Sequence, residues 1–173
     1  MKYITTLIVS ICFFIFEPTY GFYSGSSTSS HFLYMFNHAN IFHLILNCIG
    51  FLFVISIIDK FKFIKFRHKY IYPYLIAVFT SFVFNPYDIP TCGLSSVIYS
   101  LLGLFLSVSL FSRKAKIKNK KEFATFWIFI TFGMIISAIK ESSNSLLHIA
   151  NFTTYFIITI GFISLEHLLL RRS

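Results

Sequence analysis

The chain has 173 residues, of which 56% are hydrophobic and only 12% charged, with a net charge of +9. A soluble domain carries about a quarter charged residues, so this composition excludes an ordinary soluble protein and predicts one that lies mostly in lipid. Spans of about 20 residues would use nearly the whole chain. The positive charge lies between apolar runs, which favours a role in membrane topology and argues against a nucleic-acid partner.

Six apolar runs predict an all-α membrane protein with a single domain over residues 1–173. The first helix is expected at about residues 3–22. Its short apolar part also resembles a signal peptide, with a poor cleavage site, so we favour a retained helix. The other helices are expected at about 38–58, 70–85, 94–112, 123–139 and 146–168, and residues 23–37 are expected to form an outer loop.

The lysines and arginines predict the orientation of these helices. With the N-terminus inside, 14 of the 15 basic residues lie on the inner side, and only Lys140 lies outside. Short inner loops are enriched in lysine and arginine, so both termini are expected in the cytoplasm.

Three polar side chains are expected at one depth. His43 lies 17 residues from the charged residue at the inner end of its span, and Ser95 and His148 each lie 18 residues from theirs. At 1.5 Å per residue these distances are about 26 Å, just below the outer surface of a hydrocarbon core that is about 30 Å thick. Asn47 lies one turn deeper than His43 on the same helix face.

Taken singly, each of these residues would most simply form a structural hydrogen bond. Their shared depth instead favours nucleophilic catalysis, in which a histidine takes the proton of a serine. Asn47, His43 and the first backbone N–H groups of the helix at 94–112 could bind the oxyanion, and Gly93 would allow a tight bend before it. No carboxylate shares the depth, so a Ser–His dyad is expected.

A metal site is the alternative use of the histidines. His38 and His43 lie about 140° apart around a helix, which is poor geometry for joint ligation. The three cysteines form no C-x-x-C pair, and there is no H-E-x-x-H motif. The sequence therefore predicts no metal and no other cofactor.

Three motifs occur in a fixed order along the chain. Residues 38–47 read H-x4-H-x3-N, residues 93–95 read G-x-S, and His148-Ile149-Ala150 matches the start of H-x-x-G-x-x-x-G. This ordered set resembles the rhomboid family of intramembrane serine proteases, and it covers most of the chain.

The resemblance implies a role for each matching residue. Ser95 would be the nucleophile and His148 the base, with Tyr99 packed against the ring of His148. His38 would stand at the outer mouth of the site in a structural role. The oxyanion hole would consist of His43, Asn47 and the backbone N–H groups of Ser95 and Leu94.

The sequence departs from the family pattern at several positions. Ser96 replaces a glycine, and the first outer loop lacks the family's Trp-Arg element. Asn151 and Tyr155 stand where the last helix usually has two glycines, and Tyr155 is expected to push that helix away from the helix at 94–112. A stripe of small residues on the latter could receive a bulky partner: Ser96, Ser100, Gly103 and Ser107.

The sequence therefore predicts an endopeptidase that cleaves transmembrane proteins near the outer leaflet. The alternative is a catalytically weak or inactive rhomboid-like protein that binds transmembrane helices without cutting them. A transporter or channel subunit would need polar residues through the full depth of a pathway, and here they are confined to the outer layer. The Lys-, Ile- and Phe-rich composition suits a bacterial inner membrane. The oligomeric state is not indicated.

Overall fold

The computed structural model describes residues 1–15, 21–84, 90–112, 124, 127–128 and 144–170, with side chains described as far as residue 165. The helix predicted at 123–139 lies outside the described residues, apart from positions 124, 127 and 128.

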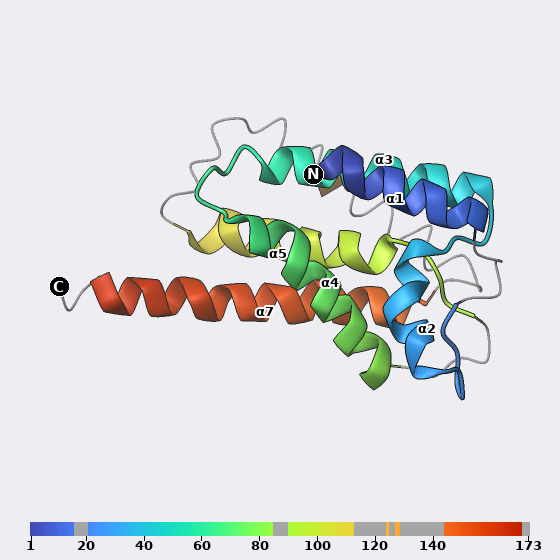
Figure 1. Cartoon of the computed structure of the whole chain (residues 1–173). Helices are drawn as coiled ribbons and strands as arrows, with labels where there is room; N and C mark the ends of the chain where they lie inside the picture. The colour runs from blue at the N-terminus through green and yellow to red at the C-terminus, as the bar shows by residue number, and fades with distance from the viewer. Residues whose placement is uncertain (16–20, 85–89, 113–123, 125–126, 129–143, 171–173) are drawn as a thin grey trace.

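The described part of the chain is helical, and its one strand-like pairing is a bridge between Phe22 and Thr91. Figure 1 shows the elements in order. They are α1 (Lys2–Ile15), α2 (Thr28–Leu33), the 3-10 helix η1 (Tyr34–Phe36), α3 (Ile41–Ile58), α4 (Phe66–Val83), α5 (Ser95–Phe111) and α7 (Ser145–Leu170).

Two of these helices are long and apolar enough to cross a membrane, namely α3 and the Ser145–Leu165 part of α7. The helices α1 and α5 are apolar but shorter. The prediction at 38–58 began three residues too early, because the Asn40 side chain accepts the His43 N–H at 2.9 Å and caps α3. The helix predicted at 70–85 begins earlier, at Phe66, so its first turn includes basic residues.

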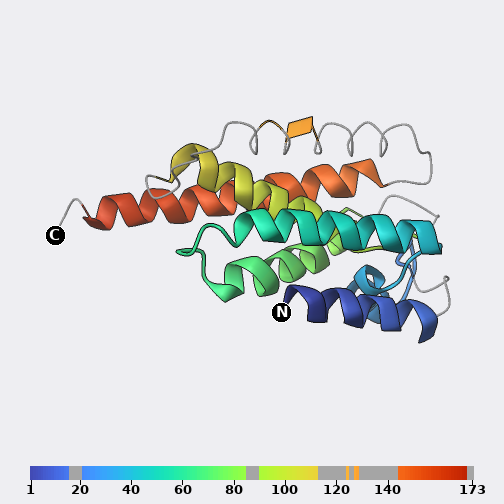
Figure 2. The ribbon, with the colours of Figure 1, turned by 90° about the horizontal axis from the view of Figure 1, so that it is seen from above.

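The helix α5 lies at the centre of the bundle. It contacts α3, α4 and α7, while α1 packs on α3 at the edge (Figures 1 and 2). Every residue of α5 from Ser96 to Val108 is buried. A helix whose side chains are apolar or small on every face is typically buried inside a bundle. The sequence of α5 therefore explains its central position.

The helices α5 and α7 approach most closely at Gly103. A Cβ atom built on Gly103 would lie 2.3 Å from the carbonyl oxygen of Phe152 on α7. The expectation that Tyr155 separates these helices is wrong, because its hydroxyl instead donates to the carbonyl of His68 on α4 at 2.6 Å. The small residue needed for close packing thus lies on α5 rather than on α7.

The Gly103→Ala substitution is expected to destabilise the protein by about 1–3 kcal/mol, since the new methyl group must push α7 away. Thermal unfolding in detergent measures this loss. Gly161→Ala on α7 is the matched control, because no atom lies within 4 Å of the new Cβ there. Equal stability of Gly103→Ala and Gly161→Ala would contradict the close approach.

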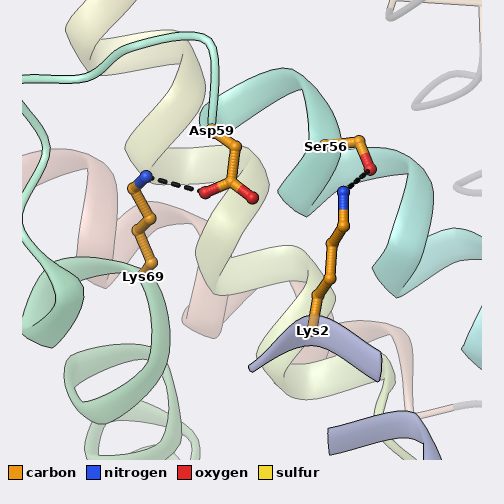
Figure 3. A network of polar contacts seen from close by, with 4 residues as sticks. All are labelled: Lys2, Ser56, Asp59 and Lys69. Atoms are coloured by element: carbon orange, nitrogen blue, oxygen red, sulfur yellow. Dashed lines mark hydrogen bonds and ion pairs between the residues drawn. The ribbon is translucent and has the colours of Figure 1, made fainter. Parts of the chain in front are cut away.

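Polar contacts join α1, α3 and α4 at the end of the bundle opposite to α2. The Lys2 Nζ donates to Ser56 Oγ at 3.0 Å, and the Lys69 Nζ lies 2.7 Å from Asp59 Oδ1 (Figure 3). The first contact fixes the start of α1 beside α3, and the second closes the turn between α3 and α4. Such partly exposed contacts set geometry more than they add stability.

Candidate active site

The hydroxyl of Ser95 and the ring of His148 face each other across the α5–α7 contact. Ser95 Oγ lies 2.9 Å from His148 Nε2, and both residues are half-buried. Ser95 is the first residue of α5, and His148 lies in the first turn of α7. The close packing of the two helices therefore brings a serine and a histidine together at their N-terminal ends.

Asn144 fixes the start of α7 and hence the height of His148. Its Oδ1 accepts the Leu147 N–H at 2.9 Å, and its backbone carbonyl accepts the His148 N–H at 3.1 Å. Its Nδ2 donates to Thr91 Oγ1 at 3.4 Å, in the segment before α5. Asn144 was not among the residues predicted from the sequence, although an asparagine just before an apolar helix is a typical N-cap signal.

The ring of Tyr99 stacks on the ring of His148. The ring centroids are 4.4 Å apart and the planes differ by only 10°. Tyr99 is buried one turn below Ser95 on the same helix. The stack restricts rotation of the imidazole and holds it in the plane that faces Ser95.

Tyr99→Ala is expected to slow the reaction of Ser95 with a fluorophosphonate probe about tenfold, since an aromatic pair contributes about 0.5–1.5 kcal/mol and the ring of His148 would lose its orientation. Tyr99→Phe keeps the stacked ring and is expected to stay close to the wild-type rate. The rate of probe labelling measures both. A Phe variant as slow as the Ala variant would show that the phenol group matters and the stack does not.

Gly93 makes the bend that leads into α5. Its φ of +112° is a conformation that side chains rarely allow. Its N–H donates to the carbonyl of Tyr34 at 2.9 Å, so η1 supports the bend. A Cβ at Gly93 would lie 2.9 Å from His43 Nε2 and 3.6 Å from Asn47 Nδ2. The bend thus presses the backbone before Ser95 against these two polar side chains of α3.

A second contact holds the segment before α5 in place. Phe22 and Thr91 exchange two backbone hydrogen bonds of 3.0 and 2.8 Å. The helices α2 and η1 were predicted only as loop, because the serine-rich run at residues 24–30, which extends into α2, is typical of loops.

Hydrogen-bond donors gather around the start of α5. The first bond within this helix runs from the Ile98 N–H to the Leu94 carbonyl at 3.1 Å, so the N–H groups of the three residues between them precede the helical pattern. Asn47 Nδ2 donates to the His43 carbonyl at 2.9 Å, which fixes the side-chain amide on the face of α3 that meets Gly93. This end of α5 can stabilise a negative charge.

The N–H of Leu94 points to His38. It donates to His38 Nε2 at 3.4 Å, and the rings of His38 and His43 meet edge to face with centroids 5.2 Å apart. Burial, and next the charge of His43, lower the pKa of His38 to about 3, so its ring is neutral and can accept this bond. The Leu94 amide would have to leave His38 to bind an oxyanion.

The structure therefore places six of the sequence-predicted residues in two groups, with contacts among the members of each group. Ser95, His148 and Tyr99 form one, and Gly93, His43 and Asn47 form the other. Across the described ranges, no group of three or more His, Cys, Asp or Glu side chains could hold a metal ion.

A protein-family model, described as the Rhomboid domain, matches residues 25–166. Comparisons with curated proteins and with solved structures give no significant match. The matched range contains α2 to α5, most of α7 and every candidate site residue.

Proposed function

The chain belongs to the rhomboid family and is an integral membrane protein, and on this premise we propose that it is an intramembrane serine endopeptidase. The observation that carries the proposal is the 2.9 Å contact between Ser95 Oγ and His148 Nε2. A serine becomes a nucleophile when a base within hydrogen-bond reach takes its proton.

In the proposed reaction Ser95 Oγ attacks the carbonyl carbon of the scissile peptide bond while His148 Nε2 takes the hydroxyl proton. The tetrahedral intermediate collapses as His148 returns the proton to the departing amine, which leaves an acyl ester on Ser95. Water then attacks the ester, with its proton passing to His148. The acid is released and the serine regains its proton.

We assign the oxyanion of each intermediate to the Ser95 N–H, the Asn47 side-chain amide and the ring of His43. Gly93 brings the backbone within contact distance of both α3 side chains, which supports this assignment. Fixed donors of this kind typically contribute about 3 kcal/mol each to the rate. The Leu94 N–H is a further donor in this proposal once it leaves His38.

The substrates in this proposal are transmembrane proteins that reach the site sideways from the bilayer. A helical backbone must leave its own hydrogen bonds to reach Ser95, so segments with glycine or proline should be preferred. We further propose six spans with both termini in the cytoplasm of a bacterial inner membrane, because 14 of 15 basic residues then lie inside. No cofactor takes part.

The alternative, a rhomboid-like protein that binds helices without cutting them, rested on Asn151 and Tyr155. Neither side chain separates α7 from α5, since the backbones meet at Gly103 and the Tyr155 hydroxyl reaches α4. His148 also remains at hydrogen-bond distance from Ser95. These observations favour the protease over the binding protein.

Co-expression with a generic transmembrane reporter tests the proposal. The wild type is expected to release the reporter's outer fragment, and Ser95→Ala and His148→Ala are expected to leave it uncut. Cleavage that persists in Ser95→Ala, or that is absent from the wild type across reporters with different helix-breaking residues, would contradict it.

A further inference from the structure

Asn151 is a fully buried polar residue that joins three helices. Its exposed fraction is 0%. Its Oδ1 accepts hydrogen bonds from Thr80 on α4 at 3.0 Å and from Ser100 on α5 at 3.3 Å. Its Nδ2 donates to the carbonyl of Leu147 at 2.8 Å, on its own helix α7. A glycine at this position could form none of these side-chain bonds.

The bonds of Asn151 lie directly beneath the histidine. Asn151 follows His148 by three residues, so the two lie on neighbouring turns of one helix face. Leu147, whose carbonyl accepts the Asn151 amide, directly precedes His148. Any rotation of the first turns of α7 must therefore break bonds to Thr80 and Ser100.

We propose that Asn151 is a positioning residue for His148, fixing the rotation of α7 so that the imidazole faces Ser95. The proposal rests on the proposed function. In this arrangement the packing of Gly103 sets the distance between α5 and α7, and Asn151 sets the angle of α7 about its own axis. A rotation of α7 would leave the buried Asn151 Oδ1 without its two donors, so the observed rotation is preferred. The Thr80 hydroxyl alone could turn to the Ile76 and Ala77 carbonyls of its own helix, at 2.9 and 3.1 Å.

Tyr155 provides the contrast to Asn151 on the same helix. Its hydroxyl also donates a hydrogen bond to α4, at the His68 carbonyl, but this bond is only partly buried and Tyr155 lies seven residues from His148. Loss of this bond should weaken the packing of α7 on α4. It should not free the first turn of α7, which carries His148. Tyr155→Phe is therefore the matched control for Asn151→Ala.

The test is the reaction of Ser95 with a fluorophosphonate probe in the purified full-length protein. Asn151→Ala is expected to lower the inactivation rate at saturating probe at least about tenfold, because small misplacements of a catalytic group have effects of this size. The half-saturating probe concentration should stay unchanged. Tyr155→Phe should lower the unfolding temperature yet react at the wild-type rate.

A second variant tests the proposal in case Asn151→Ala does not fold. Ser100→Ala removes a single bond to Asn151 and is expected to lower the same rate about threefold, in line with the modest strength of single bonds between membrane helices. Wild-type rates in both Asn151→Ala and Ser100→Ala, or an equal loss in Tyr155→Phe, would overturn the positioning role.

A readout that does not depend on proteolysis separates this proposal from the proposed function. In a background with Cys12, Cys48 and Cys92 replaced by alanine, Ser95→Cys places a thiol beside His148. An adjacent histidine speeds alkylation by iodoacetamide at neutral pH, and Asn151→Ala should slow it at least about fivefold. If the wild type does not react with fluorophosphonate, the proposed function is wrong. The ratio of the alkylation rates of Ser95→Cys with and without Asn151→Ala then decides the role of Asn151. Equal alkylation rates would overturn it.

Discussion

Replacing Gly93 by alanine is expected to lower activity more than a hundredfold. The new methyl group would lie 2.8 Å from His43 Cε1 and 2.9 Å from Nε2, and the backbone φ of +112° would be strained as well. The ring of His43 or the segment before Ser95 must then move. A displacement of about 1 Å in an active site can lower a rate about a hundredfold, and loss of the proposed oxyanion donor His43 would add to it.

Gly25→Ala separates backbone strain from the clash. Gly25 also has a positive φ, +82°, but no atom lies within 4 Å of its added Cβ. Both variants should unfold at lower temperature, since alanine is strained at both positions. Only Gly93→Ala should lose activity per folded molecule in the reporter assay. Full activity of folded Gly93→Ala would mean that this bend does not shape the site.

Replacing His148 by alanine is expected to lower the cleavage rate about 10⁴-fold or more, because a serine without its base is almost unreactive. The proposed oxyanion donors would still leave a trace of activity over the uncatalysed reaction. Initial rates on a purified transmembrane substrate in detergent or lipid measure the loss.

The control is a histidine elsewhere in the bundle. The ring of His68 on α4 meets Tyr72 and Phe162 edge to face, with centroids 4.9 and 6.1 Å apart. His68→Phe keeps the aromatic packing and removes only the imidazole, so it should retain the wild-type rate. A loss in His68→Phe equal to that in His148→Ala would argue that no single histidine is the base.

The depth of the site residues along their helices could be predicted from the sequence. Helix rise is fixed at 1.5 Å per residue, so counting from the charged helix ends placed Ser95 and His148 at one level, and the structure has their side chains 2.9 Å apart. The stacking of Tyr99 on His148, expected from the family resemblance, also appears in the structure. The roles of these residues in catalysis stay predictions.

The lateral packing could not be predicted in the same way. Helix periodicity shows which residues share a face but not which neighbour that face meets, so Tyr155 was assigned to the α5 contact rather than to α4. Asn151 was taken as a misfit at a glycine position, yet its partners Thr80 and Ser100 come from helices far apart in sequence. Bonds of this kind appear only once the helices are assembled.

The backbone hydrogen bonds around Ser95 could not be predicted from the sequence either. The Leu94 N–H was expected in the oxyanion hole, but it donates to His38. The Gly93 N–H donates to Tyr34, which lies in a 3-10 helix that no pattern indicated. A glycine motif predicts a bend, whereas the partners of its amides depend on segments that pack against it later.

The proposed function depends above all on the activation of Ser95 by His148. Its most direct test is labelling of the purified protein by a fluorophosphonate probe, with the modified residue located by mass spectrometry of the digested chain. A single modification on Ser95 is expected in the wild type, and none in Ser95→Ala or His148→Ala. Labelling of Ser95 that is undiminished in His148→Ala, or a wild type that takes up no probe, would contradict it.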